Sequence, residues 1–155
     1  MRGFVFVLAA ASLGLASCAH GAPAVGEAQC DNPALVVAFY TEALVQPERQ
    51  PRAAFERYMA PDFIEHKPDI PGGTREANAS FLEELIAAAP QARWEIVRTV
   101  AEGDLLILHV RFTLANGAPA YALADVFRVR DCRIAEHWDV VAGPVGDAVN
   151  PNSRF

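Results

Sequence analysis

The chain has 155 residues, 52% of them hydrophobic, and a formal net charge of −6 at pH 7. This length allows one domain with a substantial core and is too short for two. An acidic chain lacks the basic surface that a phosphate backbone requires, so we expect no nucleic acid as a partner.

The first segment is typical of a secretion signal, because Arg2 precedes a largely apolar run, Gly3 to Ala16, that ends in small residues. A membrane-spanning helix is the alternative, but such a helix needs about 20 apolar residues. The ending Leu15-Ala16-Ser17-Cys18 resembles the bacterial lipobox, whose cysteine is lipidated after cleavage. We therefore expect a signal peptide over residues 1–17 and a lipid anchor on Cys18.

Residues 19–29 are small, polar and rich in Gly, Ala and Pro, which is typical of a flexible tether. With Cys18 as its first residue, the tether spans 18–29 and the domain spans 30–155. These features predict a protein of the cell envelope, attached to a membrane by lipid, with its domain in the periplasm or outside the cell.

The chain has 3 cysteines, so lipidation of Cys18 leaves Cys30 and Cys132. In an oxidising compartment these two form a candidate disulfide. Two unpaired thiols remain the alternative, because the sequence does not give the distance between them.

Helical spacing of apolar residues predicts three helices before the first long strand. Asp31 or Asn32 can cap the first, a second begins at Pro51, and a third is capped by Thr74 and stopped by Pro90. Residues 62–68 between the last two are expected to be extended.

The second half of the chain alternates apolar and polar residues between turn signals, which predicts strands at 92–101, 105–114, 119–130 and 133–142. Their connections are too short for parallel crossovers, so the sheet should be antiparallel. Helices against a strongly bent antiparallel sheet form an α+β fold that can enclose a pocket.

The last hairpin carries the strongest candidate site, and Asp131-Cys132 is its expected two-residue turn. Counting outward from that turn pairs Arg130 with Arg133, Val129 with Ile134, Phe127 with Glu136, and Asp125 with Trp138. In those apolar surroundings desolvation would raise the pKa of Asp125 and make it a better base. The same count places Ala124, Val126, His137 and Asp139 on the opposite face.

Several segments together resemble one known family: Phe63-Ile64-Glu65-His66-Lys67-Pro68, Glu102-Gly103-Asp104 with His109, Asp125-Val126-Phe127-Arg128, and Ile134 to Val140. They resemble the SnoaL-like polyketide cyclases, and more narrowly the SnoaL-like aldol-condensation proteins, of the nuclear-transport-factor-2-like superfamily. The resemblance covers roughly residues 34–155. It implies a cone of helices and bent sheet around an apolar pocket, and acid/base chemistry without a cofactor.

The resemblance also assigns roles. Asp125 matches the residue that removes a proton next to a carbonyl, and His109 and His66 match the other polar pocket positions. Trp138, Phe127, Glu136 and His137 are the expected ligand-binding residues. Cys132 departs from the pattern, because the family's turn usually has glycine there, and this favours its recruitment into a disulfide.

Other interpretations of these residues stay open. Asp125 could form a salt bridge with Arg128 or Arg111, and His109 could be a core residue with both nitrogens paired. Trp138 is more often a core residue than a ligand platform. A metal site is not expected, because His66, His109 and His137 lack the short spacing that metal ligands show.

Two functional classes follow from this pattern. One is a membrane-tethered enzyme that uses Asp125 for aldol condensation, cyclisation or isomerisation of a small carbonyl compound, with His109 or His66 holding the developing enolate oxygen. The other is a pocket that binds an apolar small molecule without chemistry. A homodimer is compatible with either class.

Overall fold

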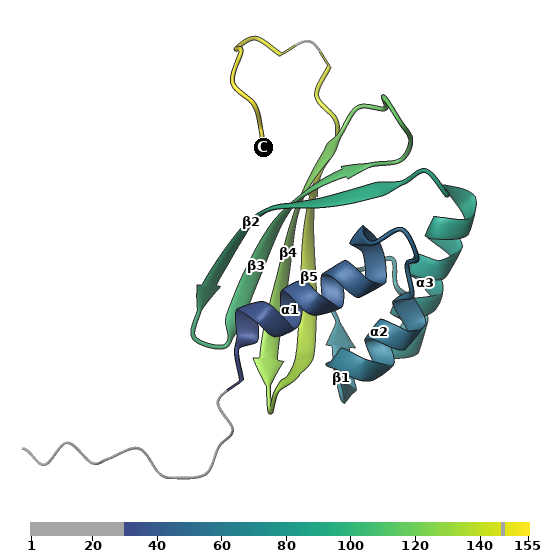
Figure 1. Cartoon of the computed structure of the whole chain (residues 1–155), viewed down its shortest axis with the longest axis vertical. Coiled ribbons are helices and arrows are strands. Elements are labelled where there is room, and N and C mark those ends of the chain that lie inside the picture. The colour runs from purple at the N-terminus through teal and green to yellow at the C-terminus, as the bar shows by residue number, and fades with distance from the viewer. Residues whose placement is uncertain (1–29, 147) are drawn as a thin grey trace, which may run out of the picture.

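The computed structural model describes residues 30–146 and 148–155 (Figure 1). The expected signal peptide, the expected lipidation site Cys18 and the expected tether lie outside these residues. In the described part of the chain, no helix is long and apolar enough to cross a membrane.

The helices form where the sequence predicts them: α1 (Asn32–Tyr40), which continues into a π-helical turn (Thr41–Val45), α2 (Pro51–Tyr58) and α3 (Arg75–Ala88). The two expected caps are present. The side chain of Asp31 accepts a hydrogen bond from the Ala34 amide at 2.9 Å, and that of Thr74 accepts one from the Ala77 amide at 3.2 Å. Each cap satisfies an amide that has no partner within its own helix.

One sheet contains β1 (Met59–Glu65), β2 (Arg93–Glu102), β3 (Leu105–Thr113), β4 (Tyr121–Arg130) and β5 (Arg133–Ala142), in the order β1-β5-β4-β3-β2. The last four strands are antiparallel, as predicted. However, β1 pairs in parallel with β5, so the expectation of a wholly antiparallel sheet is wrong at this edge. The chain between these strands includes α3 and three strands, which is long enough for a parallel pairing.

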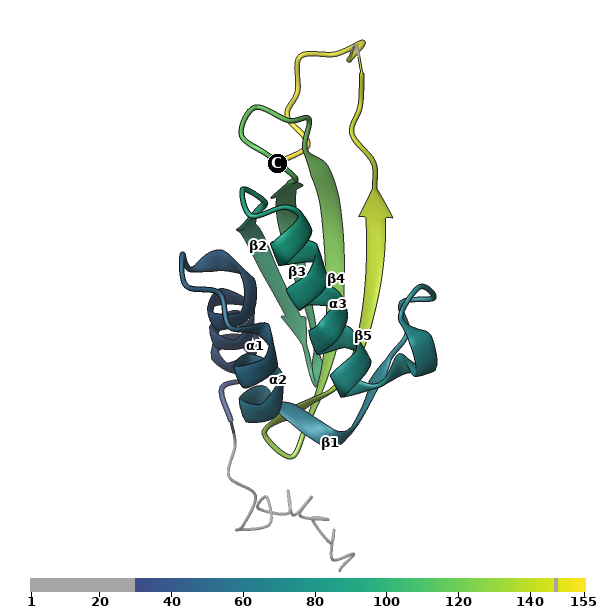
Figure 2. The ribbon, with the colours of Figure 1, turned by 90° about the vertical axis from the view of Figure 1, so that its right-hand side faces the viewer.

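The three helices and the curled sheet surround one core. In Figure 1, α1 lies across the sheet, and α2 and α3 close the side next to β1. Figure 2 shows the same arrangement from the side of α3. Phe39 is at the centre of this core, because its ring contacts those of Phe55 and Phe127 edge-on, with centroids 5.2 and 6.0 Å away. This packing fixes α1 and α2 over the sheet.

The β4–β5 hairpin turns where expected but changes register beyond the turn. Asp131 and Cys132 have φ values of 51° and 57°, and a two-residue hairpin turn of type I′ requires positive φ at both positions. Val129 pairs with Ile134, yet Arg128 pairs with Glu136, so Ala135 is an extra residue in β5. The result is a β-bulge.

The bulge overturns part of the predicted pairing. Beyond it Phe127 pairs with His137 rather than Glu136, and Asp125 pairs with Asp139 rather than Trp138. Side chains alternate between faces along a strand, so one extra residue exchanges the faces of all that follow. His137 and Asp139 therefore share the face of Asp125.

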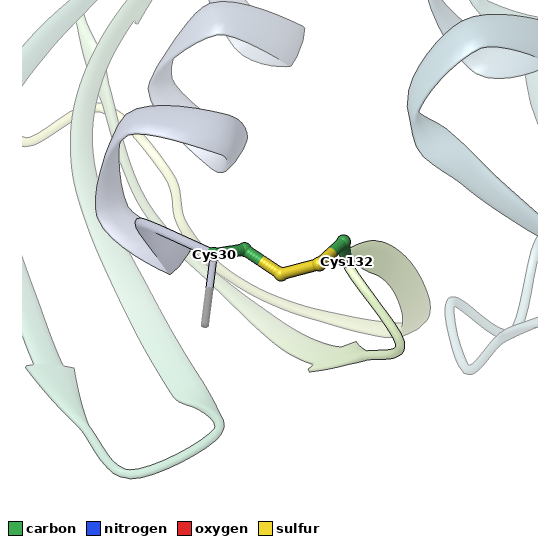
Figure 3. The surroundings of a disulfide bond; sticks show 2 residues. All are labelled: Cys30 and Cys132. Carbon is green, nitrogen blue, oxygen red and sulfur yellow. A yellow bond between two sulfur atoms is a disulfide. The ribbon is translucent and has the colours of Figure 1, made fainter. Parts of the chain in front are cut away.

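A disulfide joins Cys30 to Cys132, as predicted from the cysteine count. The two Cα atoms are 5.6 Å apart although 102 positions separate the residues in sequence. Figure 3 shows that the bond links the chain just before α1 to the β4–β5 turn.

Replacing both cysteines by serine, Cys30→Ser with Cys132→Ser, should lower the free energy of unfolding by up to about 4–5 kcal/mol. The reason is that a bond closing a loop of about 100 residues restricts the unfolded chain. Urea denaturation with and without a reductant measures this loss. The double variant should be insensitive to the reductant, and a parent protein equally insensitive would contradict the prediction.

A second double variant tests the turn separately. Cys132 has φ 57°, a conformation that costs a residue with a side chain about 1 kcal/mol relative to glycine. Cys30→Ser with Cys132→Gly should therefore be more stable than the double serine variant by about that amount.

Candidate functional site

A cavity of about 310 Å³ lies between the helices and the sheet. Most of its lining is apolar, and aromatic side chains come from both the helices and the strands: Phe39, Phe55, Phe81, Trp94, Phe112 and Phe127. The polar side chains in the lining are Tyr40, Lys67, Asn78, Tyr121, Asp125, His137 and Asp139. A pocket of this kind, apolar with a few converging polar groups, is typical of a small-molecule site.

Asp125 lies on β4 with only 5% of its surface exposed. Its Oδ2 accepts a hydrogen bond of 2.6 Å from the Tyr40 hydroxyl on α1, and its Oδ1 lies 3.5 Å from His137 Nε2. Burial and then the charge of Asp125 raise the pKa of Tyr40 well above its usual value. Tyr40 therefore stays protonated and remains a donor.

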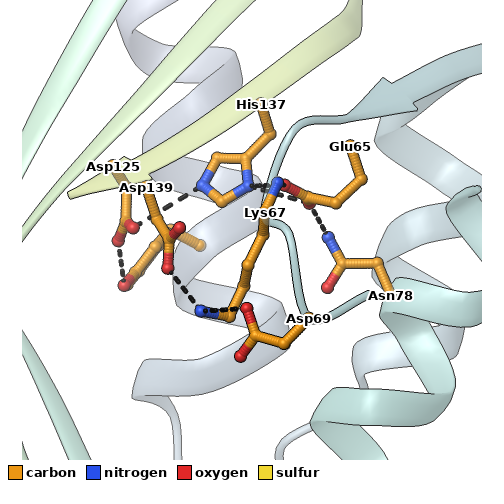
Figure 4. Close-up of polar contacts among 8 residues, drawn as sticks. Glu65, Lys67, Asp69, Asn78, Asp125, His137 and Asp139 are labelled. Carbon is orange, nitrogen blue, oxygen red and sulfur yellow. Dashed lines mark hydrogen bonds and ion pairs between the residues drawn. The ribbon is translucent and has the colours of Figure 1, made fainter. Parts of the chain in front are cut away.

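His137 lies between two carboxylates (Figure 4). Its Nδ1 is 2.9 Å from both carboxylate oxygens of Glu65, and its Nε2 points toward Asp125. Burial lowers the pKa of His137, but the hydrogen bonds and charges of Asp125 and Glu65 outweigh that effect and raise it to about 9. At neutral pH the ring is therefore an imidazolium with a proton on each nitrogen.

Glu65 is held on the far side of His137 by donors from two further segments. Its Oε2 accepts a hydrogen bond from the side-chain amide of Asn78 on α3. Its Oε1 accepts one of 2.9 Å from the Lys67 amide. The parallel pairing of β1 with β5 makes Glu65 the register partner of His137, which explains why their side chains meet.

Lys67 connects the loop after β1 to β5. Its Nζ donates to Asp139 Oδ2 at 2.9 Å and lies 3.2 Å from Asp69 Oδ1 (Figure 4). Burial lowers the pKa of Lys67, but the hydrogen bonds to Asp139 and Asp69 outweigh that effect and raise it. The Lys67–Asp139 pair thus adds one charge of each sign to the lining.

The structure places three of the predicted site residues in the cavity lining, namely Asp125, Phe127 and His137. The predicted places of Trp138 and Glu136 beside Asp125 are wrong, because the bulge at Ala135 turns both to the other face of the sheet.

Trp138 and Glu136 belong to a cluster outside the cavity instead. The Trp138 ring stacks on that of His66 with centroids 4.5 Å apart. Glu136 bonds to His66 Nε2 at 3.1 Å and to Arg128 Nε at 2.9 Å. Arg128 also bonds to Asp104, so it is not the partner of Asp125.

The predicted placement of His66 and His109 in the pocket beside Asp125 is also wrong. His109 alternates with the buried Leu108 and Val110 on β3 and therefore points to the opposite face. There its Nδ1 lies 2.7 Å from Arg98, and its ring stacks on Phe155. His66 follows the end of β1 and contacts the outer cluster described above.

Sequence reasoning missed Tyr40, Lys67, Asn78 and Asp139 in the cavity lining, and it missed Glu65 as the partner of His137 outside that lining. One signal was available, because Glu65 follows the buried Phe63 by two residues and so shares its face of a strand. Tyr40 and Asn78 stand among apolar helix positions and carry no comparable signal. No group of three or more potential metal ligands is arranged as a metal site in residues 30–146 and 148–155.

A curled sheet that encloses an apolar cavity together with three helices is the nuclear-transport-factor-2-like architecture. The SnoaL-like domain family matches residues 36–137, and the chain belongs to this family. No functionally curated protein matches it.

Three solved structures illustrate the shared fold. A proposed isomerase of the SnoaL-like family from Agrobacterium tumefaciens is 15% identical, with a TM-score of 0.61 over 74% of this chain and 100% of that one. Wild-type IdmH from Streptomyces antibioticus, a proposed polyketide cyclase, is 22% identical, with a TM-score of 0.55 over 70% and 91%. An NTF2-like protein of unknown function from Cytophaga hutchinsonii is 15% identical, with a TM-score of 0.58 over 76% and 95%.

The raised pKa of His137 predicts a stability that falls at alkaline pH. The pKa of His137 is about 9 in the folded state, against 6.5 for the ordinary group, so protonation of the ring adds to the free energy of unfolding. This contribution is fully present below about pH 6.5. That contribution, about 3 kcal/mol, should be lost as the pH rises through about 9. Urea denaturation at a series of pH values from neutral to alkaline measures this loss.

His137→Gln should remove this decline in stability. The control variant is His109→Gln, which changes a histidine outside the cavity and should keep the decline. An unchanged pH dependence in His137→Gln would contradict the assignment.

Proposed function

We propose that this chain is an enzyme that performs cofactor-free acid/base chemistry on a small carbonyl compound, by aldol condensation, cyclisation or isomerisation. The observation that supports this most directly is the Asp125 carboxylate, which lines an apolar cavity and is held by Tyr40 and His137. A carboxylate in such a place can remove a proton from a carbon next to a carbonyl.

The energetics of the site favour chemistry over simple binding. Buried ions lose their hydration, and even paired ones contribute little to stability compared with apolar residues of similar size. A cavity that only bound an apolar molecule would not need ionised Asp125 and His137 at its wall. Such clusters are typical of sites where proton transfer occurs.

In the proposed reaction Asp125 is the base. Tyr40 and His137 orient its two oxygens, and each oxygen keeps a further lone pair for the substrate proton. The carbonyl oxygen is two bonds from the carbon that loses this proton. The Tyr40 hydroxyl and the His137 Nε2–H are thus close enough to stabilise the developing enolate oxygen.

We also propose that the mature protein is lipid-anchored in the cell envelope. The lipobox-like Leu15 to Cys18 and the apolar run before it support this proposal. The Cys30–Cys132 disulfide agrees with it, because such bonds persist in oxidising compartments.

Asp125→Asn should lower the rate of proton removal by about 10²–10⁴, the usual contribution of one general base, and leave ligand affinity nearly unchanged. The measurement is deuterium exchange at the acidic carbon of β-tetralone, a small aromatic ketone. Asp62→Asn is the matched control, because Asp62 is exposed and pairs with Arg130 outside the cavity. Equal exchange rates in Asp125→Asn and the parent would favour the binding function instead.

Cys18→Ala should release the protein from the membrane fraction, because the lipid would have no attachment site. Mass spectrometry of the parent should find the mature N-terminus at a modified Cys18. An N-terminus elsewhere, or a Cys18→Ala variant that still requires detergent for extraction, would contradict the anchor.

A further inference from the structure

The two carboxylates beside His137 differ in their access to a ligand. Asp125 lines the cavity and lies 3.5 Å from His137 Nε2. The Glu65 side chain has 0% of its surface exposed, lies outside the cavity lining, and is closer to the ring, with both oxygens 2.9 Å from Nδ1. Only one of the two can therefore exchange a proton with a substrate.

The position of Glu65 is strongly constrained. The His66 amide donates to the His137 carbonyl at 2.9 Å, which fixes the register of the two strands beside Glu65. Gly73, with φ 59°, approaches so closely that a Cβ there would lie 2.7 Å from the Glu65 carbonyl oxygen. The loop after β1 thus packs directly against the backbone of Glu65, which limits any movement of the strand end that carries its side chain.

The remaining groups near His137 do not replace Glu65. Tyr40 reaches only Asp125, and the Phe127 ring stacks on His137 at 4.7 Å without adding charge. Lys67 pairs with Asp139 and with Asp69, so these three charges are directed at one another rather than at His137. The net charge that His137 experiences therefore comes from Asp125 and Glu65.

Proton transfer to Asp125 changes this balance. When the carboxylate takes up a substrate proton it becomes neutral, and its negative charge passes to the enolate, so that Glu65 is the counter-ion that stays fixed beside His137. Without Glu65 the imidazolium would depend on that transient enolate charge alone, and in an apolar cavity it would release its proton more readily. Glu65 keeps its charge because no substrate reaches it.

We propose that Glu65 is a positioning residue, the permanent counter-ion that keeps His137 protonated on both nitrogens, so that Nε2–H remains a donor throughout the reaction. This inference rests on the proposed function, because it assumes that Asp125 changes its protonation state. Glu65 acts through His137 and does not contact the substrate.

The test is a titration of ¹⁵N-labelled histidine by NMR, in which the signal missing from His137→Gln identifies His137 among the 4 histidines. In Glu65→Gln the midpoint of His137 should fall by at least about one pH unit, a tenfold loss of proton affinity. The exchange rate of β-tetralone should fall about 10- to 100-fold through kcat rather than KM, and the alkaline limb of its pH profile should shift with the midpoint.

Two further variants make the test specific. Glu136→Gln is the matched control, because Glu136 bonds to His66 on the outside and should leave the His137 midpoint unchanged. Glu65→Asp keeps the charge at a greater distance and should give a midpoint between those of the parent and Glu65→Gln. It also provides the measurement if Glu65→Gln does not fold.

An unchanged His137 midpoint in either folded Glu65 variant would overturn the inference, whatever the activity. If Asp125→Asn abolishes exchange while that midpoint stays unchanged, the proposed function stands and the role of Glu65 is removed. Normal exchange in Asp125→Asn would overturn the proposed function instead, and the titration would still decide whether Glu65 holds the proton on His137.

Discussion

The extra residue in β5, Ala135, is the constraint on which the site depends. A regular hairpin would place Trp138 opposite Asp125 and leave His137 on the outer face, because side chains alternate strictly along a strand. The bulge reverses that alternation for every residue after it. It brings His137 and Asp139 to the cavity and moves Trp138 to the outside. One residue therefore converts a solitary carboxylate into an acid/base cluster.

Once these groups are buried, their arrangement determines whether the fold tolerates them. The charges alternate along the line Asp125, His137, Glu65, and neutral donors, Tyr40 and Asn78, complete the two ends. In the described part of the chain every buried side-chain nitrogen and oxygen has a hydrogen-bond partner. These hydrogen bonds and ion pairs offset the cost of removing the charged groups from water, which is the condition for keeping ions in an apolar interior.

Local signals predicted much of the fold, and this is where sequence reasoning is physically well founded. Caps at Asp31 and Thr74, the turn at Asp131 and the paired cysteines all depend on neighbouring residues or simple counting. The site is only partly predictable, because the parallel pairing of β1 with β5 depends on contacts between distant segments, and the pairing count assumed a hairpin without a bulge. The assignment of His109 failed for a simpler reason, since Leu108 and Val110 occupy the core side of the strand.

The disulfide connects this site to the beginning of the domain. Tyr40 ends α1, which starts just after Cys30, and Asp125 lies on the strand that leads to Cys132. The Cys30–Cys132 bond thus joins the two elements whose side chains form the Tyr40–Asp125 hydrogen bond. If α1 shifted along the sheet, the Tyr40–Asp125 hydrogen bond would break. The buried carboxylate of Asp125 would then have one donor fewer, at a cost of about 1–3 kcal/mol. The cross-link therefore restricts the motion to which the base is most sensitive.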